Sequence, residues 1–232
     1  KTIYYGGNFL FKSTDRGDNW TKMSSDLTTG LDRNSLPIMD RKPDRNVLSL
    51  HDGVNSYPCI TTISESPRSP QVVWVGTDDG NLQVTRDGGK TWKNVVEKVS
   101  GVPKGTYVSR AEASYQTEGT AYVTFDGHRN NDFGIYVFMT SDYGETWKNI
   151  GTGLPNNKGI ANVIREHPRN PNLLFVGTEY GAYASWDRGA SWTRLKMNLP
   201  TVPVDDILVH PRDNDLIFGT HGRSIYILDD IT

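Results

Sequence analysis

Short hydrophobic runs alternate with turn residues along the whole chain, and they recur in a constant order. The segments 59–99 and 161–199 align almost without gaps. Segment 107–150 is the same unit with a longer middle loop, 205–230 repeats three of the runs, and 2–24 supplies the last three. Runs of this length between turns rich in Gly and Asp predict an all-β chain without a convincing helix.

Each unit predicts four short strands. The first strand ends near a proline, the second closes on Gly-Thr, the third follows a tight turn, and the fourth begins at a tryptophan. Four-stranded units of about 40–50 residues, repeated along one chain, are typical of a β-propeller. The predicted blades span 1–27, 58–99, 105–151, 158–199 and 203–232, with a long inter-blade loop at 28–57.

The pattern Ser/Thr-x-Asp-x-Gly-x-x-Trp occurs four times, each time between the third and fourth predicted strands. Asp accepts hydrogen bonds from backbone N–H groups of its own turn, and Gly permits the positive φ of a chain reversal. Trp buries a large apolar face while its indole N–H needs a partner. The motif residues are Asp15, Asp87, Asp142, Asp187, Trp20, Trp92, Trp147 and Trp192. One hairpin per blade separates the four aspartates around the rim, so we predict a structural role rather than a shared catalytic or calcium site.

Composition narrows the possible partners. The 232 residues allow one large domain, and the net charge of −2 gives no bulk attraction to nucleic acid or anionic membranes. No apolar run approaches the roughly 20 residues that span a bilayer. The single cysteine, Cys59, excludes an intrachain disulfide, and we expect it to be a small buried side chain in a strand. We predict no cofactor and no metal site.

The hairpin pattern is the Asp-box, or BNR repeat, of sialidases, xyloglucanases, sortilin-type receptors and a photosystem-assembly factor. The stretches NVIREHPRNPNLLFVGTEYG and VPVDDILVHPRDNDLIFGTHGRSIYILDDI resemble large bacterial proteins of the sortilin-like BNR group, which are often labelled glycosyl hydrolases. The resemblance implies an exported protein, extracellular or periplasmic, and a targeting signal outside this segment. It transfers no catalytic residue, because neither the sialidase nor the xyloglucanase active-site pattern matches.

The turns that join second and third strands lie opposite the hairpins of a propeller and form its default binding surface. In this chain they are rich in charged and aromatic residues, including Asp78 and Arg129. His51 and Asp52 lie in the long loop, and Arg110 replaces the apolar residue found at Ile63 on an innermost strand. The ligand-binding candidates are His51, Asp52, Asp79, Arg110, Asp126, His128, Glu179, Tyr180, His221 and Arg223.

Three functions remain open from the sequence. The first is a module that binds a peptide, a protein or a glycan on this face. The second is a glycoside hydrolase, in which carboxylates such as Asp79 and Glu179 would stand about 5–9.5 Å apart. The third is an architectural spacer. Each candidate has a structural alternative as a solvated turn residue, and Glu65, Glu112 and Glu166, which recur at one register, indicate a ring of hydrogen bonds.

The first unit lacks its innermost strand, and the last lacks its hairpin motif and outer strand. We therefore expect a section of a larger propeller with two exposed edges, whose partners are the remaining blades of the same or a longer chain. Such a section is expected to associate when it is isolated.

Overall fold

The computed structural model describes residues 2–37, 41–42, 44, 56–154 and 159–231, and these residues form five antiparallel sheets. Within each sheet the strands lie side by side in chain order, so consecutive strands are joined by hairpins. The described residues contain three short 3-10 helices, η1 (Arg33–Ser35), η2 (Val96–Lys98) and η3 (His128–Asn130). The all-β prediction is confirmed.

Three sheets have four strands and two have three. The four-stranded sheets are β4 (Ile60–Ser66), β5 (Ser69–Thr77), β6 (Leu82–Thr85) and β7 (Lys93–Asn94); β8 (Tyr107–Ala113), β9 (Ala121–Asp126), β10 (Tyr136–Thr140) and β11 (Lys148–Asn149); and β12 (Ala161–His167), β13 (Asn170–Thr178), β14 (Gly181–Ser185) and β15 (Thr193–Arg194). The three-stranded sheets are β1 (Ile3–Gly6), β2 (Leu10–Ser13) and β3 (Thr21–Lys22), and β16 (Val204–Val209), β17 (Leu216–Thr220) and β18 (Ile225–Leu228). Each fourth strand is two residues long and starts one residue after the motif tryptophan.

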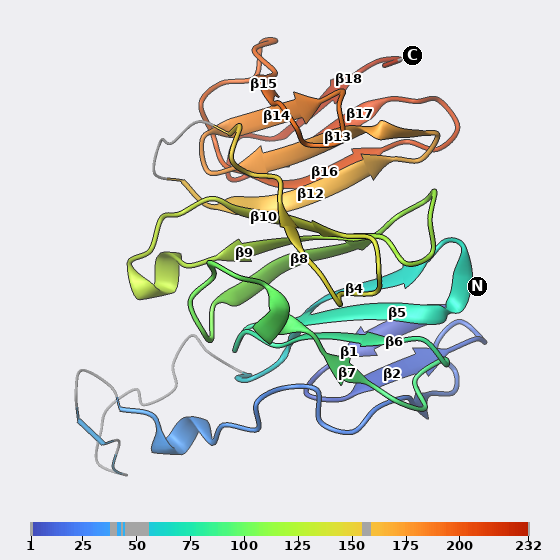
Figure 1. Ribbon diagram of the computed structural model, residues 1–232, viewed down its shortest axis with the longest axis vertical. Helices are drawn as coiled ribbons and strands as arrows, with labels where there is room; N and C mark the ends of the chain where they lie inside the picture. The colour runs from blue at the N-terminus through green and yellow to red at the C-terminus, as the bar shows by residue number, and fades with distance from the viewer. Residues whose placement is uncertain (1, 38–40, 43, 45–55, 155–158, 232) are drawn as a thin grey trace.

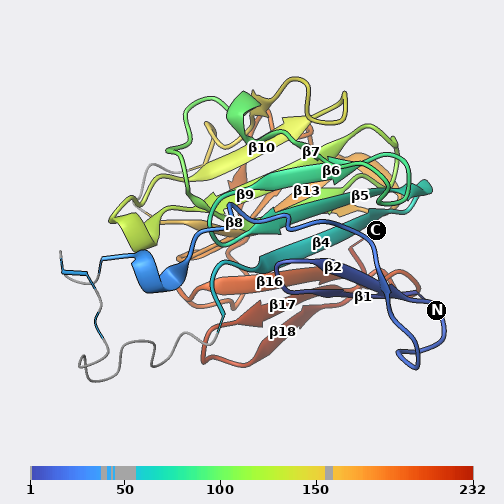
Figure 2. The same ribbon diagram turned by 90° about the horizontal axis from the view of Figure 1, so that it is seen from below.

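The sheets are stacked, with β1–β3 at one end and β16–β18 at the other (Figure 1). Figure 2 looks along the stack from the β1–β3 end. The innermost strands β4, β8, β12 and β16 contact one another in that order. The turns between second and third strands, with η3 among them, lie along the left edge in Figure 1, which we call the turn face. The motif hairpins lie along the opposite edge.

The core lies between sheets rather than within them. One cluster joins Trp74 of β5 to Val108, Phe125 and Phe138 of the next sheet, all at most 2% exposed. Close approach at the end of the second strand demands glycine, because a Cβ on Gly76 would stand 2.4 Å from a methyl group of Val108. This contact gives a packing reason for the Gly-Thr pairs seen in the sequence.

The pairing of β8 corrects the sequence alignment by one residue. Each innermost strand has a bulge, after which Arg110 pairs with Thr124, as Thr62 pairs with Gly76 and Asp206 with Gly219. Arg110 is therefore equivalent to Thr62, Val163 and Asp206, and Ala111 takes the apolar position of Ile63, Ile164 and Ile207. The prediction that Arg110 occupies the isoleucine position is wrong, because an apolar residue had to fill that site and the bulge moves the arginine to the next row.

The same shift separates the three glutamates that the sequence placed at one register. Glu166 is buried and accepts hydrogen bonds from Tyr122 Oη (2.9 Å), Ser114 Oγ (2.8 Å) and the Tyr115 N–H (2.5 Å) of the preceding sheet. Glu65 accepts one from Tyr4 Oη of its preceding sheet. Glu112 lies one strand position away, at the position of Ser64 and Arg165, and forms an ion pair with Arg165 of the following sheet. Two of the three glutamates are thus equivalent, and all three link neighbouring sheets.

Candidate functional site

The four motif aspartates bind their own hairpins. In the third copy, Asp142 Oδ1 accepts hydrogen bonds from Thr140 Oγ1 (2.8 Å) and the Thr146 N–H (2.9 Å). The same two bonds recur at Asp15, Asp87 and Asp187. Hydrogen bonds to the charged carboxylate, chiefly from the side chains of Asn19, Thr91 and Ser191, lower the pKa values of Asp15, Asp87 and Asp187 to about 2.

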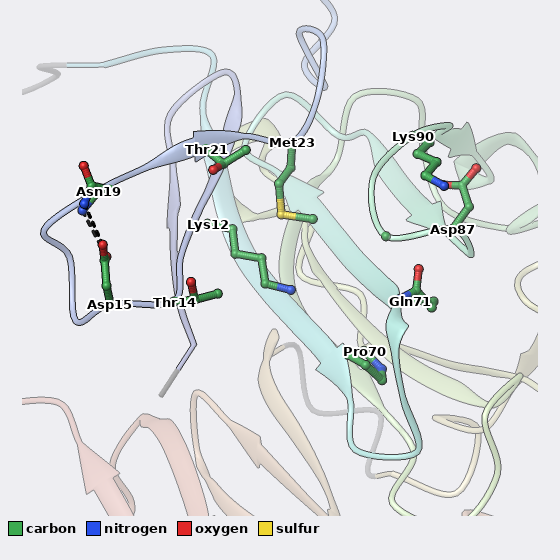
Figure 3. Close-up of a pocket in the computed structure, with 11 residues that line it drawn as sticks. Lys12, Thr14, Asp15, Asn19, Thr21, Met23, Pro70, Gln71, Asp87 and Lys90 are labelled. Atoms are coloured by element: carbon green, nitrogen blue, oxygen red, sulfur yellow. Dashed lines mark hydrogen bonds between the residues drawn. The ribbon is translucent and has the colours of Figure 1, made fainter.

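A cleft of about 510 Å³ opens between the first two sheets on the hairpin edge. Figure 3 shows Asp15 and Asp87 on opposite sides of it, with Asp15 turned towards Asn19 of its own hairpin. Because each carboxylate is already hydrogen-bonded within its turn, the cleft does not bring the two aspartates together as one site. Among the residues that the structure describes, no group of three or more His, Cys, Asp or Glu side chains is arranged to hold a metal ion.

Equivalent positions on the turn face carry titratable side chains in four successive sheets. In each of these sheets, one residue at the end of the second strand is paired with the residue at the entrance of the innermost strand. The backbone hydrogen bonds are Asp78 N–H to Cys59 O, Glu179 N–H to Ile160 O and His221 N–H to Pro203 O. Asp126 pairs with Tyr107 in the same way. Asp78, Asp126, Glu179 and His221 therefore form one row across the face. The carboxylate equivalent to Glu179 is therefore Asp78, and Asp79 lies one residue further along the turn.

The Asp79 carboxylate is engaged in hydrogen bonds with neighbouring turn and loop residues. It is 4% exposed and accepts hydrogen bonds from Thr29 N–H (2.7 Å), Thr29 Oγ1 (2.6 Å) and Thr77 Oγ1 (2.6 Å). These bonds fasten the start of the long loop over the turn. A cavity of about 570 Å³ lies beside them, lined by Leu31, Val99 and Val102 among others. His51 and Asp52 lie outside the described residues.

Asp78, Tyr107, Asp126 and Arg129 gather between the second and third sheets, and we call them the Tyr107 cluster. The Arg129 guanidinium lies over the Tyr107 ring, 4.7 Å from its centroid. Burial raises the pKa of Tyr107; the charge of Arg129 opposes this rise, and those of Asp78 and Asp126 add to it. Asp126 Oδ1 accepts the His128 N–H (2.8 Å) in η3, while the His128 side chain is 60% exposed. An aromatic ring, a cation and two carboxylates thus share one part of the turn face.

Cys59 and Tyr57 border this cluster. Cys59 precedes β4, is half-buried, and donates to Asp78 through its N–H (2.7 Å) and its thiol (3.4 Å). The prediction of a buried strand cysteine is wrong, because the thiol faces a carboxylate at the strand entrance. Burial raises the pKa of Asp78, which the Cys59 hydrogen bonds partly offset. Sequence reasoning missed Tyr57 and Tyr107, although Tyr107 begins the innermost strand β8 and Tyr57 lies shortly before β4.

The remaining candidates lie on the fourth and fifth sheets, apart from Arg110 in β8 of the third sheet. Tyr180 is 39% exposed, and Arg223 is exposed in the turn before β18. His221 Nδ1 stands 3.3 Å from Asp205 Oδ2. Arg110 lies away from the turns, where its Nη2 and the Nη2 of Arg165 both donate to Asp206 Oδ1, at 2.9 and 3.0 Å. The structure therefore does not gather the eight candidates that it describes into one site.

The chain is similar to xyloglucanases. It is 34% identical over 191 residues to the oligoxyloglucan-reducing end-specific xyloglucanase of Emericella nidulans, covering 62% of this chain and 22% of that protein. It is 28% identical over 179 residues to a xyloglucanase of Hypocrea jecorina, covering 75% and 20%. Xyloglucanase Xgh74A of Acetivibrio thermocellus is 24% identical over 285 residues, covering 100% and 32%. The chain thus spans between 20% and 32% of the length of these relatives. No protein-family model matches it.

Solved structures show the fold. The GH74 xyloglucanase from Xanthomonas campestris superposes with a TM-score of 0.65 at 17% identity, covering 97% of this chain and 34% of that one. YCF48 bound to D1 peptide superposes with a TM-score of 0.57 at 16% identity, covering 98% and 61%. These neighbours are β-propellers, which confirms the predicted fold class. No helix among the described residues is long and apolar enough to cross a membrane.

Proposed function

We propose that this chain is a section of a larger, glycoside hydrolase-like β-propeller, and that its turn face binds a xyloglucan-type glycan at the Tyr107 cluster. The cluster carries the proposal. Sugar rings present apolar C–H faces that stack on aromatic side chains, while their hydroxyls pair with charged groups, and the cluster offers a tyrosine, an arginine and two carboxylates together. The similarity to xyloglucanases supports the choice of glycan.

A hydrolytic role for the same face is the second candidate. Glycoside hydrolysis uses two carboxyl groups, of which the general acid needs a raised pKa. Burial raises the pKa of Asp78, so it suits the acid, and Asp126 is the second carboxylate of the cluster. A polymeric glycan is met outside the cytoplasm, so we place the protein there. Membership of the sortilin-like BNR group remains part of this proposal.

Titration of the chain with a xyloglucan oligosaccharide tests the binding proposal. We expect Tyr107→Ala to weaken binding by about tenfold, because the loss of an aromatic contact costs about 0.5–1.5 kcal/mol beyond its buried area. Trp186→Ala is the matched control, since Trp186 is 58% exposed and lies in a motif hairpin on the opposite edge. Isothermal titration calorimetry measures both.

Equal affinity in the Tyr107→Ala variant and the parent would reject the glycan site. A short peptide that binds in place of the oligosaccharide would favour peptide recognition, as in the YCF48 complex. Turnover of the oligosaccharide that is lost in both Asp78→Asn and Asp126→Asn, with binding retained, would establish the hydrolytic role. Binding without turnover would support a binding module that does not hydrolyse the oligosaccharide.

A further inference from the structure

Each motif hairpin inside the stack docks on the sheet before it. The residue directly after each outermost strand donates its backbone N–H to the neighbouring strand of the same sheet. These residues are Met23, Val95, Ile150 and Leu195. The Trp92 indole N–H donates to Met23 O (3.2 Å), and the Trp192 indole N–H donates to Ile150 O (2.6 Å). Trp147 instead donates to Gly144 O of its own hairpin (3.1 Å) and packs edge-on against Trp74 of the preceding sheet, with ring centroids 6.0 Å apart.

The motif glycines make the same junctions. A Cβ on Gly89 would stand 2.7 Å from Met23 O, one on Gly144 would stand 2.9 Å from Val95, and one on Gly189 would stand 2.8 Å from Ile150. Three hairpins thus pack their glycine against the residue after the neighbour's outermost strand, and in two of them the tryptophan also donates to the carbonyl of that residue. This contact fixes how successive sheets stack.

The hairpin of the first sheet has the same residues but no such neighbour. Trp20 is 44% exposed, and its indole N–H has no acceptor among the described residues. Gly17 has only its own Trp20 within 4 Å of a built Cβ. Tyr5 is 65% exposed and meets the Trp20 ring edge-on at 6.1 Å, and Ile3 is 40% exposed. Ile3, Tyr5 and Trp20 form an uncovered apolar patch, which we call the Trp20 patch.

We propose that the Trp20 patch docks a complete four-stranded blade of this same repeat, and that this blade offers Trp20 the backbone carbonyl of an aliphatic residue directly after its outermost strand. The proposal follows the occupied junctions, in which all three glycines pack on that residue and two of the three tryptophans donate to its carbonyl. This inference rests on the part of the proposed function that makes the chain a section of a larger propeller. It does not depend on which ligand the turn face binds.

The sheet β16–β18 of a second copy does not satisfy the patch. It also exposes apolar side chains, since Leu208, Ile225 and Ile227 are 49%, 66% and 60% exposed. However, its described residues include no outermost strand, so it has no equivalent of Met23 or Ile150 to offer. Association of copies through these two faces would not offer the Trp20 indole N–H the carbonyl that Trp92 and Trp192 use.

Three alanine variants of the chain test whether Trp20 differs from its equivalents. We expect Trp92→Ala and Trp192→Ala each to lower the melting temperature by at least about 5 °C, because each removes an occupied junction. Trp20→Ala is expected to change it by no more than about 1 °C. A loss with Trp20→Ala as large as with Trp192→Ala would show that Trp20 serves its own hairpin, and would overturn the proposal.

A chain extended at its N-terminus by one blade tests what covers the Trp20 patch. A second copy of residues 107–172, which carries a complete blade and the next innermost strand, is fused directly before Thr2 of the full chain, so that Thr2 takes the place of Leu173. We expect acrylamide quenching of Trp20 to fall, measured as the difference between this protein and its Trp20→Phe variant, and Trp20→Ala to become destabilising. Quenching as strong as in the parent would overturn the proposal. If the extended chain does not fold, the oligomeric state of the parent chain is the test. A concentration-dependent dimer that Trp20→Ala abolishes would show that a second copy covers the patch, and would overturn the proposal of a blade.

Discussion

Replacing Arg165 with methionine is expected to lower the free energy of unfolding by about 3–5 kcal/mol, since it removes one partner of a buried ion pair. Arg165 forms an ion pair with Glu112, whose side chain is 6% exposed, and donates through Nε to Ile207 O (2.7 Å). It therefore connects the third, fourth and fifth sheets. For a chain of this size the melting temperature should fall by roughly 10 °C, measured by calorimetry.

The double variant Glu112→Gln with Arg165→Met separates the buried charge from the lost packing. It is expected to recover more than half of the loss, because the uncompensated carboxylate is the main penalty. Arg212→Met is the matched control, since Arg212 pairs with Asp213 in solvent and is 82% exposed. A control as destabilised as Arg165→Met, or a double variant with no recovery, would contradict this account of the interior pair.

Replacing Glu166 with alanine is the second large change. It leaves three donors in the preceding sheet without an acceptor, the hydroxyls of Ser114 and Tyr122 and the Tyr115 N–H. An unsatisfied buried donor costs about 1–3 kcal/mol, so we expect a loss of about 3 kcal/mol or more. Glu166→Gln retains one acceptor oxygen and should lose about half as much. Chemical denaturation of both variants measures the difference.

The Glu166 contribution also depends on pH. Burial raises the pKa of Glu166 above the ordinary value of 4.5, and its hydrogen bonds partly oppose this rise. The folded chain therefore binds this proton more tightly than the unfolded chain, so the stabilisation is complete below 4.5 and is lost as the pH rises through the folded pKa. The parent should lose stability relative to Glu166→Gln as the pH is raised from 4.5. A constant difference across that range would contradict the burial argument.

Local patterns predicted the all-β fold because each motif forms its hairpin within a few residues. Asp187 reaches Ser185 and Ser191 along one hairpin, and such contacts depend on sequence spacing alone. The same spacing held in all four copies. The position of Arg110 was wrong because a bulge in β8 shifts the register by one residue, and the nearby Glu112 had suggested a different alignment.

The candidate site was harder to predict because its partners are distant in sequence. Asp79 is occupied by Thr29, which lies 50 residues earlier, so its role as a fastening group has no local pattern. Arg129 meets Tyr107 only because η3 returns the chain over the start of β8. Turn residues alone therefore predicted which charged side chains lie on the turn face, while the aromatic Tyr107 comes from the entrance of an innermost strand.

Hydrogen–deuterium exchange with and without a xyloglucan oligosaccharide tests the central claim most directly, because it reports which edge of the sheets the glycan covers. We predict slower exchange at 57–60, 77–80, 107–109 and 126–132 on the turn face. We predict no change at 13–20, 85–92, 140–147 or 185–192, where the motif aspartates already bind their own hairpins. Protection confined to those hairpins, or no protection at the turn face under saturating oligosaccharide, would contradict the account.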